Sequence, residues 1–166
     1  MSERNARITG GCQCGAVRYA LHAPLGRASI CHCRMCQKAF GAFYGPFVGV
    51  PLPAFELTRG KLSIFKSSDV AERGFCRDCG TPLSVRTLSE DKIDISIGSL
   101  DDPSIAKPTI QWGIESRIAW VGELDELPGE ATEADGNISH HDLIRATNHQ
   151  HPDYDTDVWP PAGERG

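Results

Sequence analysis

Short runs of alternating hydrophobic and polar residues recur along the chain as far as Trp120, and few segments show helical periodicity. In the run from Ala16 to His22, Val17, Tyr19 and Leu21 alternate with more polar positions, which predicts a half-buried strand. Similar patterns predict strands at 73–75, 83–86 and 93–97, and one or two more within 109–120. The sequence therefore predicts a mainly β single domain built from antiparallel sheets.

Glycine and proline modify two of the predicted strands. Phe43 to Val50 is interrupted by Gly45 and Pro46, so we expect an edge strand or a bulged strand there. Residues 55–58 and 62–65 flank the sequence Arg-Gly-Lys, which predicts a hairpin with a glycine-containing turn. The predicted architecture is thus a set of short strands joined by tight turns.

The character of the sequence changes after Leu127. We expect residues 1–127 to form the β domain and residues 128–166 to form an irregular, partly disordered extension rich in histidine and proline. A short helix within 141–147 is the element by which this extension would dock. Its four histidines are expected to be solvated: His140, His141, His149 and His151.

Composition narrows the function classes. The chain of 166 residues carries a formal net charge of -5, which argues against a protein that binds nucleic acid phosphates. It has neither an apolar leader nor an apolar run long enough to cross a bilayer, so we expect no membrane association. The expected location is the cytoplasm, where clustered thiols stay reduced and are more often metal ligands than disulfides. Whether the domain forms a homodimer stays open.

Seven cysteines carry the strongest chemical signal. They fall into a CxC pair, a CxCxxC motif and a CxxC pair followed by glycine. Tetrahedral zinc makes a division into four and three meaningful, because structural sites use four protein ligands and catalytic sites keep one position open. The predicted structural set is Cys12, Cys14, Cys76 and Cys79, and the predicted open, catalytic set is Cys31, Cys33 and Cys36.

Other uses of these cysteines are weaker. The three central cysteines would share a metal with one of the pairs only by leaving an awkward remainder of unused thiols. An odd number of cysteines at such tight spacing is a poor disulfide framework. A redox CxxC would need a βαβ pattern, which the sequence does not contain.

The ordered motifs resemble the glutathione-dependent formaldehyde-activating enzyme family, which includes the centromere protein V domain. The resemblance spans about residues 10–127 and rests on GCQCG at 11–15, CHCRMC at 31–36, GFCRDCGTPL at 74–83 and IGSLDD at 97–102. It implies a zinc-bearing β-tent fold, with a structural zinc on the first and last cysteine pairs and a second zinc on the central motif. It also implies a carbon–sulfur lyase that joins glutathione, or a similar thiol, to formaldehyde or another small aldehyde.

Several side chains are candidates for supporting roles. Arg34 and Lys38 are candidates for binding a glutathione carboxylate, with surface charge beside an anionic metal centre as the alternative. His32 is a candidate proton shuttle, or else a neighbour that supports a ligand. Asp101 and Asp102 are expected to cap a short helix. Three aromatic residues are candidates for the pocket wall: Phe40, Phe43 and Phe47.

Two rival functions remain at this point. In the first, both zinc ions are structural and the domain is a binding module without catalysis. In the second, the open site acts on a thiol adduct other than that of glutathione. A vacant metal position in a pocket would favour an enzyme, whereas a buried and fully ligated position would favour a binding module.

Overall fold

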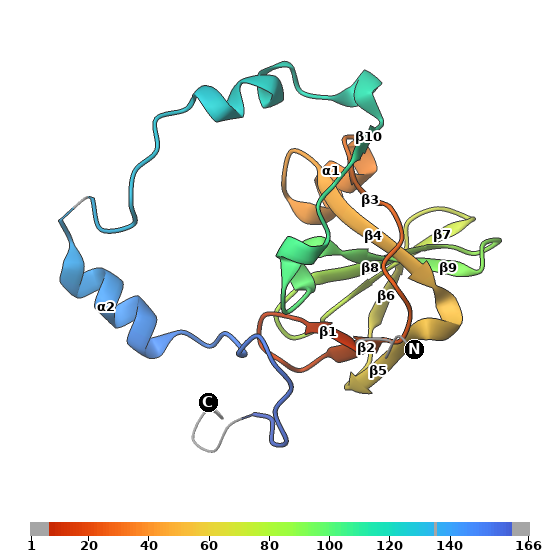
Figure 1. Cartoon of the computed structure of the whole chain (residues 1–166), viewed down its shortest axis with the longest axis horizontal. Helices are drawn as coiled ribbons and strands as arrows, with labels where there is room; N and C mark the ends of the chain where they lie inside the picture. The colour runs from red at the N-terminus through yellow and green to blue at the C-terminus, as the bar shows by residue number, and fades with distance from the viewer. Residues whose placement is uncertain (1–6, 135, 161–166) are drawn as a thin grey trace, which may run out of the picture.

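The computed structural model describes residues 7–134 and 136–160. Within these residues the protein is a mainly β single domain, as predicted, with ten strands in two sheets and few helices (Figure 1). None of the described helices is long and apolar enough to cross a bilayer. The three-stranded sheet has the order β1-β2-β5 and consists of β1 (Ile8–Gly11), β2 (Arg18–Leu21) and β5 (Phe55–Arg59).

The larger sheet has the strand order β10-β3-β4-β9-β8-β7-β6. Its strands are β3 (Ala28–Cys31), β4 (Gly45–Pro51), β6 (Ser63–Lys66), β7 (Ala71–Phe75), β8 (Pro82–Thr87), β9 (Lys92–Ser96) and β10 (Ile110–Trp112). The α-helices are α1 (Arg34–Phe40) and α2 (Ile138–Thr147). The short 3-10 helices are η1 (Leu52–Ala54), η2 (Ile97–Ser99), η3 (Pro103–Ile105), η4 (Ile114–Ser116) and η5 (Ala119–Glu126).

Alternate residues of the central strands form the hydrophobic core. Val48 and Val50 of β4 lie directly opposite Ile95 and Ile93 of β9, and all four side chains are buried. Because successive side chains of a strand point to opposite faces, the residues between them lie on the other face of the sheet. Phe47 and Asp94 are therefore presented on the face away from this core.

Strand β2 is more buried than its alternating pattern predicted. All four of its residues are buried, including Ala20 and the charged Arg18. The prediction of a half-buried strand was wrong, because β2 is the central strand of its sheet and the polar end of Arg18 is paired inside the protein. Arg18 donates to Asp101 Oδ1 at 2.8 Å and to Asp155 Oδ1 at 2.8 Å.

Three predictions about strand pairing need correction. Strand β4 is neither an edge strand nor bulged, because it pairs in regular register with β3 and β9. Its Gly49 has a different role: a Cβ there would lie 2.9 Å from Asp94 Oδ1, so glycine lets this carboxylate lie against β4. The predicted 55–65 hairpin does not form, since β5 pairs with β2 and β6 pairs with β7. The sheets are also not wholly antiparallel, because β10 runs parallel to β3.

The C-terminal segment returns to the domain and docks beside the first two strands (Figure 1). Residues 151–159 make its contacts with the domain. The sequence had instead suggested docking by the helix that corresponds to α2. The backbone N–H of His151 donates to the Gln13 carbonyl at 2.7 Å, and Trp159 Nε1 donates to the Cys14 carbonyl. The expectation that His151 is solvated was wrong, since only 8% of the residue is exposed.

Conformation and space both require glycine at position 15. Gly15 has a φ of +79°, and a Cβ there would lie 2.2 Å from a ring carbon of His151. The positive φ favours glycine, and the missing side chain is what lets the C-terminal segment approach this loop. The docking site is therefore built into the CQCG sequence of the first cysteine pair.

The aspartates of the IGSLDD motif have separate roles. Asp102 accepts a hydrogen bond from the Ser104 backbone N–H at 3.0 Å and caps η3, as predicted. Asp101 is not a cap: it accepts from Arg18 and from the Thr9 hydroxyl. This pairing compensates the burial of Arg18, because a buried charge needs a partner.

We predict that acid weakens the docking of the C-terminal segment. His151 Nε2 accepts from Thr156 Oγ1 at 2.9 Å and faces Arg59, while Nδ1 donates to the Pro152 carbonyl, so docking requires the neutral ring. Burial, then Arg18 and Arg59, lower the pKa of His151, against the opposing effects of that carbonyl and Asp101. When the segment is undocked, His151 binds a proton as the pH falls below its ordinary pKa of 6.5, whereas the docked ring binds one only at a lower pH. The free energy of docking therefore becomes less favourable as the pH falls below 6.5.

The tryptophan fluorescence of Trp159 reports this docking, and it is obtained as the part of the wild-type emission that is absent in the Trp159→Phe variant. We expect it to shift towards that of an exposed indole between pH 7 and pH 5, at constant metal content. A Trp159 signal that does not change over this range would contradict the assignment.

Candidate metal centres

The first cysteine cluster joins two loops from different sheets. Cys12 and Cys14 lie between β1 and β2, and Cys76 and Cys79 lie between β7 and β8. The four sulfurs lie within 4.8 Å of one another, with 3.6 Å between Cys12 and Cys14 and 3.9 Å between Cys14 and Cys76. Four sulfurs about 2.3 Å from a tetrahedral zinc ion are separated by about 3.8 Å. The donor set and its spacing therefore fit zinc.

Backbone turns hold these thiols in place. In the CxxCG turn, the Gly80 N–H donates to the Cys76 carbonyl at 2.9 Å, and Gly80 has the positive φ of 77° for which glycine is suited. The Cys76 N–H donates to the Thr81 carbonyl at 3.0 Å and closes the turn. On the other loop, the Val17 N–H donates to Cys12 Sγ at 3.2 Å. Hydrogen bonds of this kind stabilise thiolates.

The thiols of this cluster cannot all ionise without a cation. Burial raises the pKa of Cys76 to about 11 and raises that of Cys14 further. At Cys79 burial acts in the same direction, but hydrogen bonds from the side chain and backbone of Thr81 prevail and lower the pKa to about 6. A bound divalent cation stabilises the thiolate forms that burial disfavours, which is the electrostatic basis of metal binding by thiolates.

The second cluster lies where β3 passes into α1. Cys31 ends the strand, Cys33 is the N-cap of the helix, and Cys36 lies in its first turn. Their sulfurs also lie within 4.8 Å of one another. The Cys33 thiol accepts from the Cys36 N–H at 3.4 Å, and Arg73 Nη2 donates to Cys36 Sγ at 3.4 Å. Burial raises the pKa of Cys36 to about 12 in spite of Arg73.

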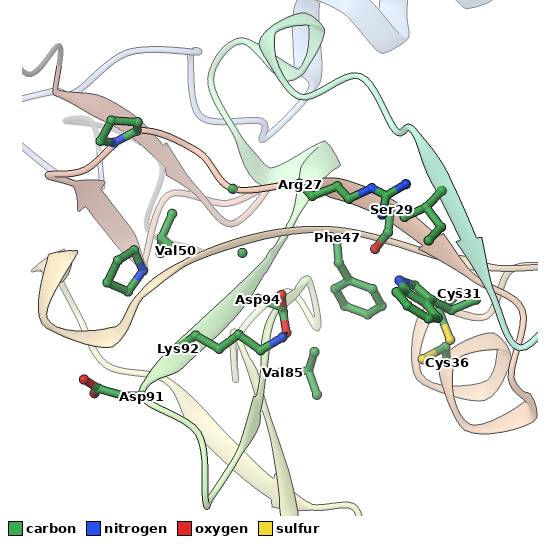
Figure 2. Close-up of a pocket in the computed structure, with 16 residues that line it drawn as sticks. Arg27, Ser29, Cys31, Cys36, Phe47, Val50, Val85, Asp91, Lys92 and Asp94 are labelled. Atoms are coloured by element: carbon green, nitrogen blue, oxygen red, sulfur yellow. The ribbon is translucent and has the colours of Figure 1, made fainter.

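The second cluster opens onto a groove of about 750 Å³, which we call the thiol groove. It runs along the sheet face opposite the core, from Cys31 and Cys36 past Phe47 to Asp94 and Lys92. Figure 2 shows Cys31 and Cys36 with their sulfurs together at one end of the groove and Asp91 at the other. One end therefore presents thiols and the other presents charged groups.

The structure separates some predicted site residues from this groove. Arg34, Lys38 and Phe40 line a different hollow on the far side of α1. Phe43 does not line the thiol groove either, because its ring packs against Tyr44 and Trp120. Of the three predicted wall residues, only Phe47 lies beside Cys31 and Cys36.

His32 lies inside the protein and not on the groove surface. The ring is fully buried, and its Nε2 lies 2.8 Å from Gln111 Oε1. Its Nδ1 has no hydrogen-bond partner among the described residues. The Gln37 amide donates to the His32 carbonyl at 2.7 Å and so ties the cysteine loop to α1. These contacts hold His32, and with it the backbone between Cys31 and Cys33, in place.

Most of the other groove residues were not predicted from the sequence. Trp112 faces the groove because parallel pairing places it opposite Cys31, and this register could not be read from the chain. Arg27 and Asp94 also line the groove. The alternation Ile93-Asp94-Ile95 was a usable signal for Asp94, because it placed the carboxylate on the face away from the core.

Comparison with known proteins places both cysteine clusters within the region that matches a known family. The model of the family described as "Glutathione-dependent formaldehyde-activating enzyme" matches residues 7–116, which include all seven cysteines and both clusters. The chain belongs to this family. The match ends before η5, so α2 and the docked C-terminal segment lie outside the shared region.

One relative and one solved structure extend the comparison. A protein of Phaeosphaeria nodorum with the provisional name glutathione-dependent formaldehyde-activating enzyme is 30% identical over 81 residues, which is 48% of this chain and 43% of that protein. The match therefore spans less than half of the relative. The crystal structure of a Rhodobacter sphaeroides protein superposes with a TM-score of 0.51 at 22% identity and covers 62% of this chain and 98% of that one. At this identity the likeness shows the fold.

We predict that the two clusters respond differently to the same substitution. Cys76→Ser should lower the melting temperature by at least about 10 °C, because folding and metal binding are linked where a metal joins two sheets. Cys33→Ser should change it by less than about 3 °C, since serine is also a good N-cap for α1. Thermal unfolding of the two zinc-loaded variants tests this. The reverse order would mean that the structural and open sites have been exchanged.

Proposed function

We propose that the protein makes and breaks the carbon–sulfur bond between glutathione and formaldehyde. The observation that carries this proposal is the contrast between the clusters: one offers four thiols, and the other offers three and borders the thiol groove. The family to which the chain belongs supports the same substrates. In enzyme terms the reaction is that of a carbon–sulfur lyase working in either direction.

Each cluster has its own metal in this proposal. Cys12, Cys14, Cys76 and Cys79 hold a structural zinc ion, and Cys31, Cys33 and Cys36 hold an exchangeable one. With a zinc ion bound, Cys31, Cys33 and Cys36 would leave one coordination position for a substrate thiol, whose proton would be lost near neutral pH. Phe47 and Trp112, which line the same end of the groove, flank the place where the glutathione sulfur reacts.

The reaction balances without an oxidant or reductant. The glutathione S–H bond breaks, the sulfur electron pair forms a bond to the aldehyde carbon, and the carbonyl oxygen takes up a proton to give a hydroxymethyl group. In the reverse direction the carbon–sulfur bond breaks and the thiol is restored. A cavity beside the thiols therefore has to hold a peptide thiol and one very small carbonyl compound.

The charged end of the groove suits the rest of glutathione. At neutral pH that peptide carries two carboxylates and one ammonium group. Lys92 already lies 3.2 Å from Glu90 and 3.7 Å from Asp94, whereas no described carboxylate lies within ion-pair distance of Arg27. We therefore assign Arg27, which lies beside Ser29 and between the two ends of the groove in Figure 2, to a substrate carboxylate. Burial raises the pKa of Asp94 in spite of Lys92, so an ammonium group beside it would stabilise its charged form.

We predict that Arg27→Gln raises the KM for glutathione about tenfold and changes kcat little, because the lost contact binds substrate equally in the ground and transition states. Steady-state kinetics with formaldehyde in excess measures both constants. Arg27→Lys should recover part of the loss, and Lys61→Gln, at an exposed position outside the groove, should behave as the wild type. A wild-type KM in Arg27→Gln would remove Arg27 from the site.

We predict that one zinc ion per chain becomes labile when glutathione is added, and that the other does not. Elemental analysis gives the zinc content, and a colorimetric chelator gives the rate of release. S-methylglutathione is the matched control, because it keeps the charges of glutathione but has no thiol. Two zinc ions that both ignore glutathione would contradict the proposal and favour a domain in which both metals are structural.

A further inference from the structure

A second hollow lies between helix α1 and strands β6, β7 and β8, and we call it the α1 groove. Its volume is about 690 Å³, which is within the range of small-molecule sites. In the described structure none of the seven cysteines lines it, so it is separate from the thiol groove. The proposed reaction leaves this hollow without a role.

The lining of the α1 groove is largely apolar. Phe40 and Phe75 contribute to it from α1 and the end of β7. Two further lining residues are unusually exposed for their type: Phe65 is 61% exposed and Met35 is 56% exposed. Apolar side chains gathered in a concave surface and left open to water are typical of a binding site.

Three cations line the same groove. Arg34 and Lys38 lie one helical turn apart on α1, and Arg73 comes from β7. Among the described residues no carboxylate lies within ion-pair distance of any of the three. Arg34 donates to the Gln37 side chain at 3.1 Å, and Arg73 donates to Cys36 Sγ at 3.4 Å. The charge around this apolar surface is therefore positive, and no described carboxylate pairs with it, although Arg73 also faces the Cys36 thiol.

We propose that the α1 groove binds a small organic carboxylate with an apolar body. The apolar body covers Phe65 and Met35, and the carboxylate accepts hydrogen bonds from Lys38 and the two guanidinium groups, which bind carboxylates well. Glutathione does not fit this description, because it is polar along its whole length. The proposal does not depend on the reaction assigned to the thiol groove.

The strand register places the α1 groove beside the thiol groove. Phe65, Arg73, Val85 and Asp94 are successive cross-strand partners, so their side chains share one face of the sheet. The first two line the α1 groove and the last two line the thiol groove. Arg73 lies at the border and touches Cys36, so it is the residue through which a carboxylate in one groove would be felt in the other.

Calorimetric titration of the zinc-loaded full chain with 4-phenylbutyrate tests this proposal. We expect one molecule to bind per chain, and 4-phenylbutanol, which has the same apolar body without the charge, to bind at least about tenfold more weakly. Lys38→Gln should weaken 4-phenylbutyrate binding about three- to tenfold. Lys61→Gln, which removes an exposed lysine elsewhere, should leave it unchanged.

Four results would overturn the proposal. The first three are absence of 4-phenylbutyrate binding, equal binding of the alcohol, and equal effects of the two lysine substitutions. The fourth is displacement of 4-phenylbutyrate by saturating glutathione in direct competition, which would place the probe in the thiol groove. Retained binding in the presence of glutathione supports a separate site. Because no reaction is measured, the result stands whether or not glutathione labilises zinc.

Discussion

The fold depends on the meeting of four thiols from loops that belong to different sheets. The first cysteine pair follows β1 of the small sheet, and the last pair follows β7 of the large one. Burial raises the pKa values of Cys14 and Cys76, so these groups stay protonated unless a bound cation stabilises their thiolate forms. The C-terminal segment adds to this junction, since His151 and Trp159 bond to the backbone of the same CQCG loop.

Joining the sheets in this way leaves one face of the large sheet available for chemistry. The three-cysteine cluster lies at the N-terminus of helix α1, and residues of α1 line both the thiol groove and the α1 groove. Arg73 lies between the grooves and donates to Cys36. The three-cysteine cluster is therefore held by the end of β3 and the first turn of α1, with charged side chains around it.

Local patterns predicted much of this architecture, and pairing between distant segments explains what they missed. The cysteine spacings predicted both clusters, and the CxxCG motif predicted the turn at Gly80. Gly45 and Pro46 were misread as signs of an edge, because the sequence does not reveal that β4 would pair with both β3 and β9. Arg34 and Lys38 are four residues apart and so share a side of α1, but this spacing does not show whether the cysteines face the same side. The burial of His151 depends on a contact with Gln13 far away along the chain.

X-ray absorption at the zinc edge is the sharpest test of whether one cluster is a closed structural site and the other an open, thiol-binding site. We expect four sulfurs around one zinc ion, and three sulfurs with one lighter atom around the other. Adding glutathione should replace the lighter atom and give an all-sulfur spectrum, whereas S-methylglutathione should not. All-sulfur zinc before any addition, or a lighter ligand that persists with glutathione, would mean that Cys31, Cys33 and Cys36 do not form an open, thiol-binding site.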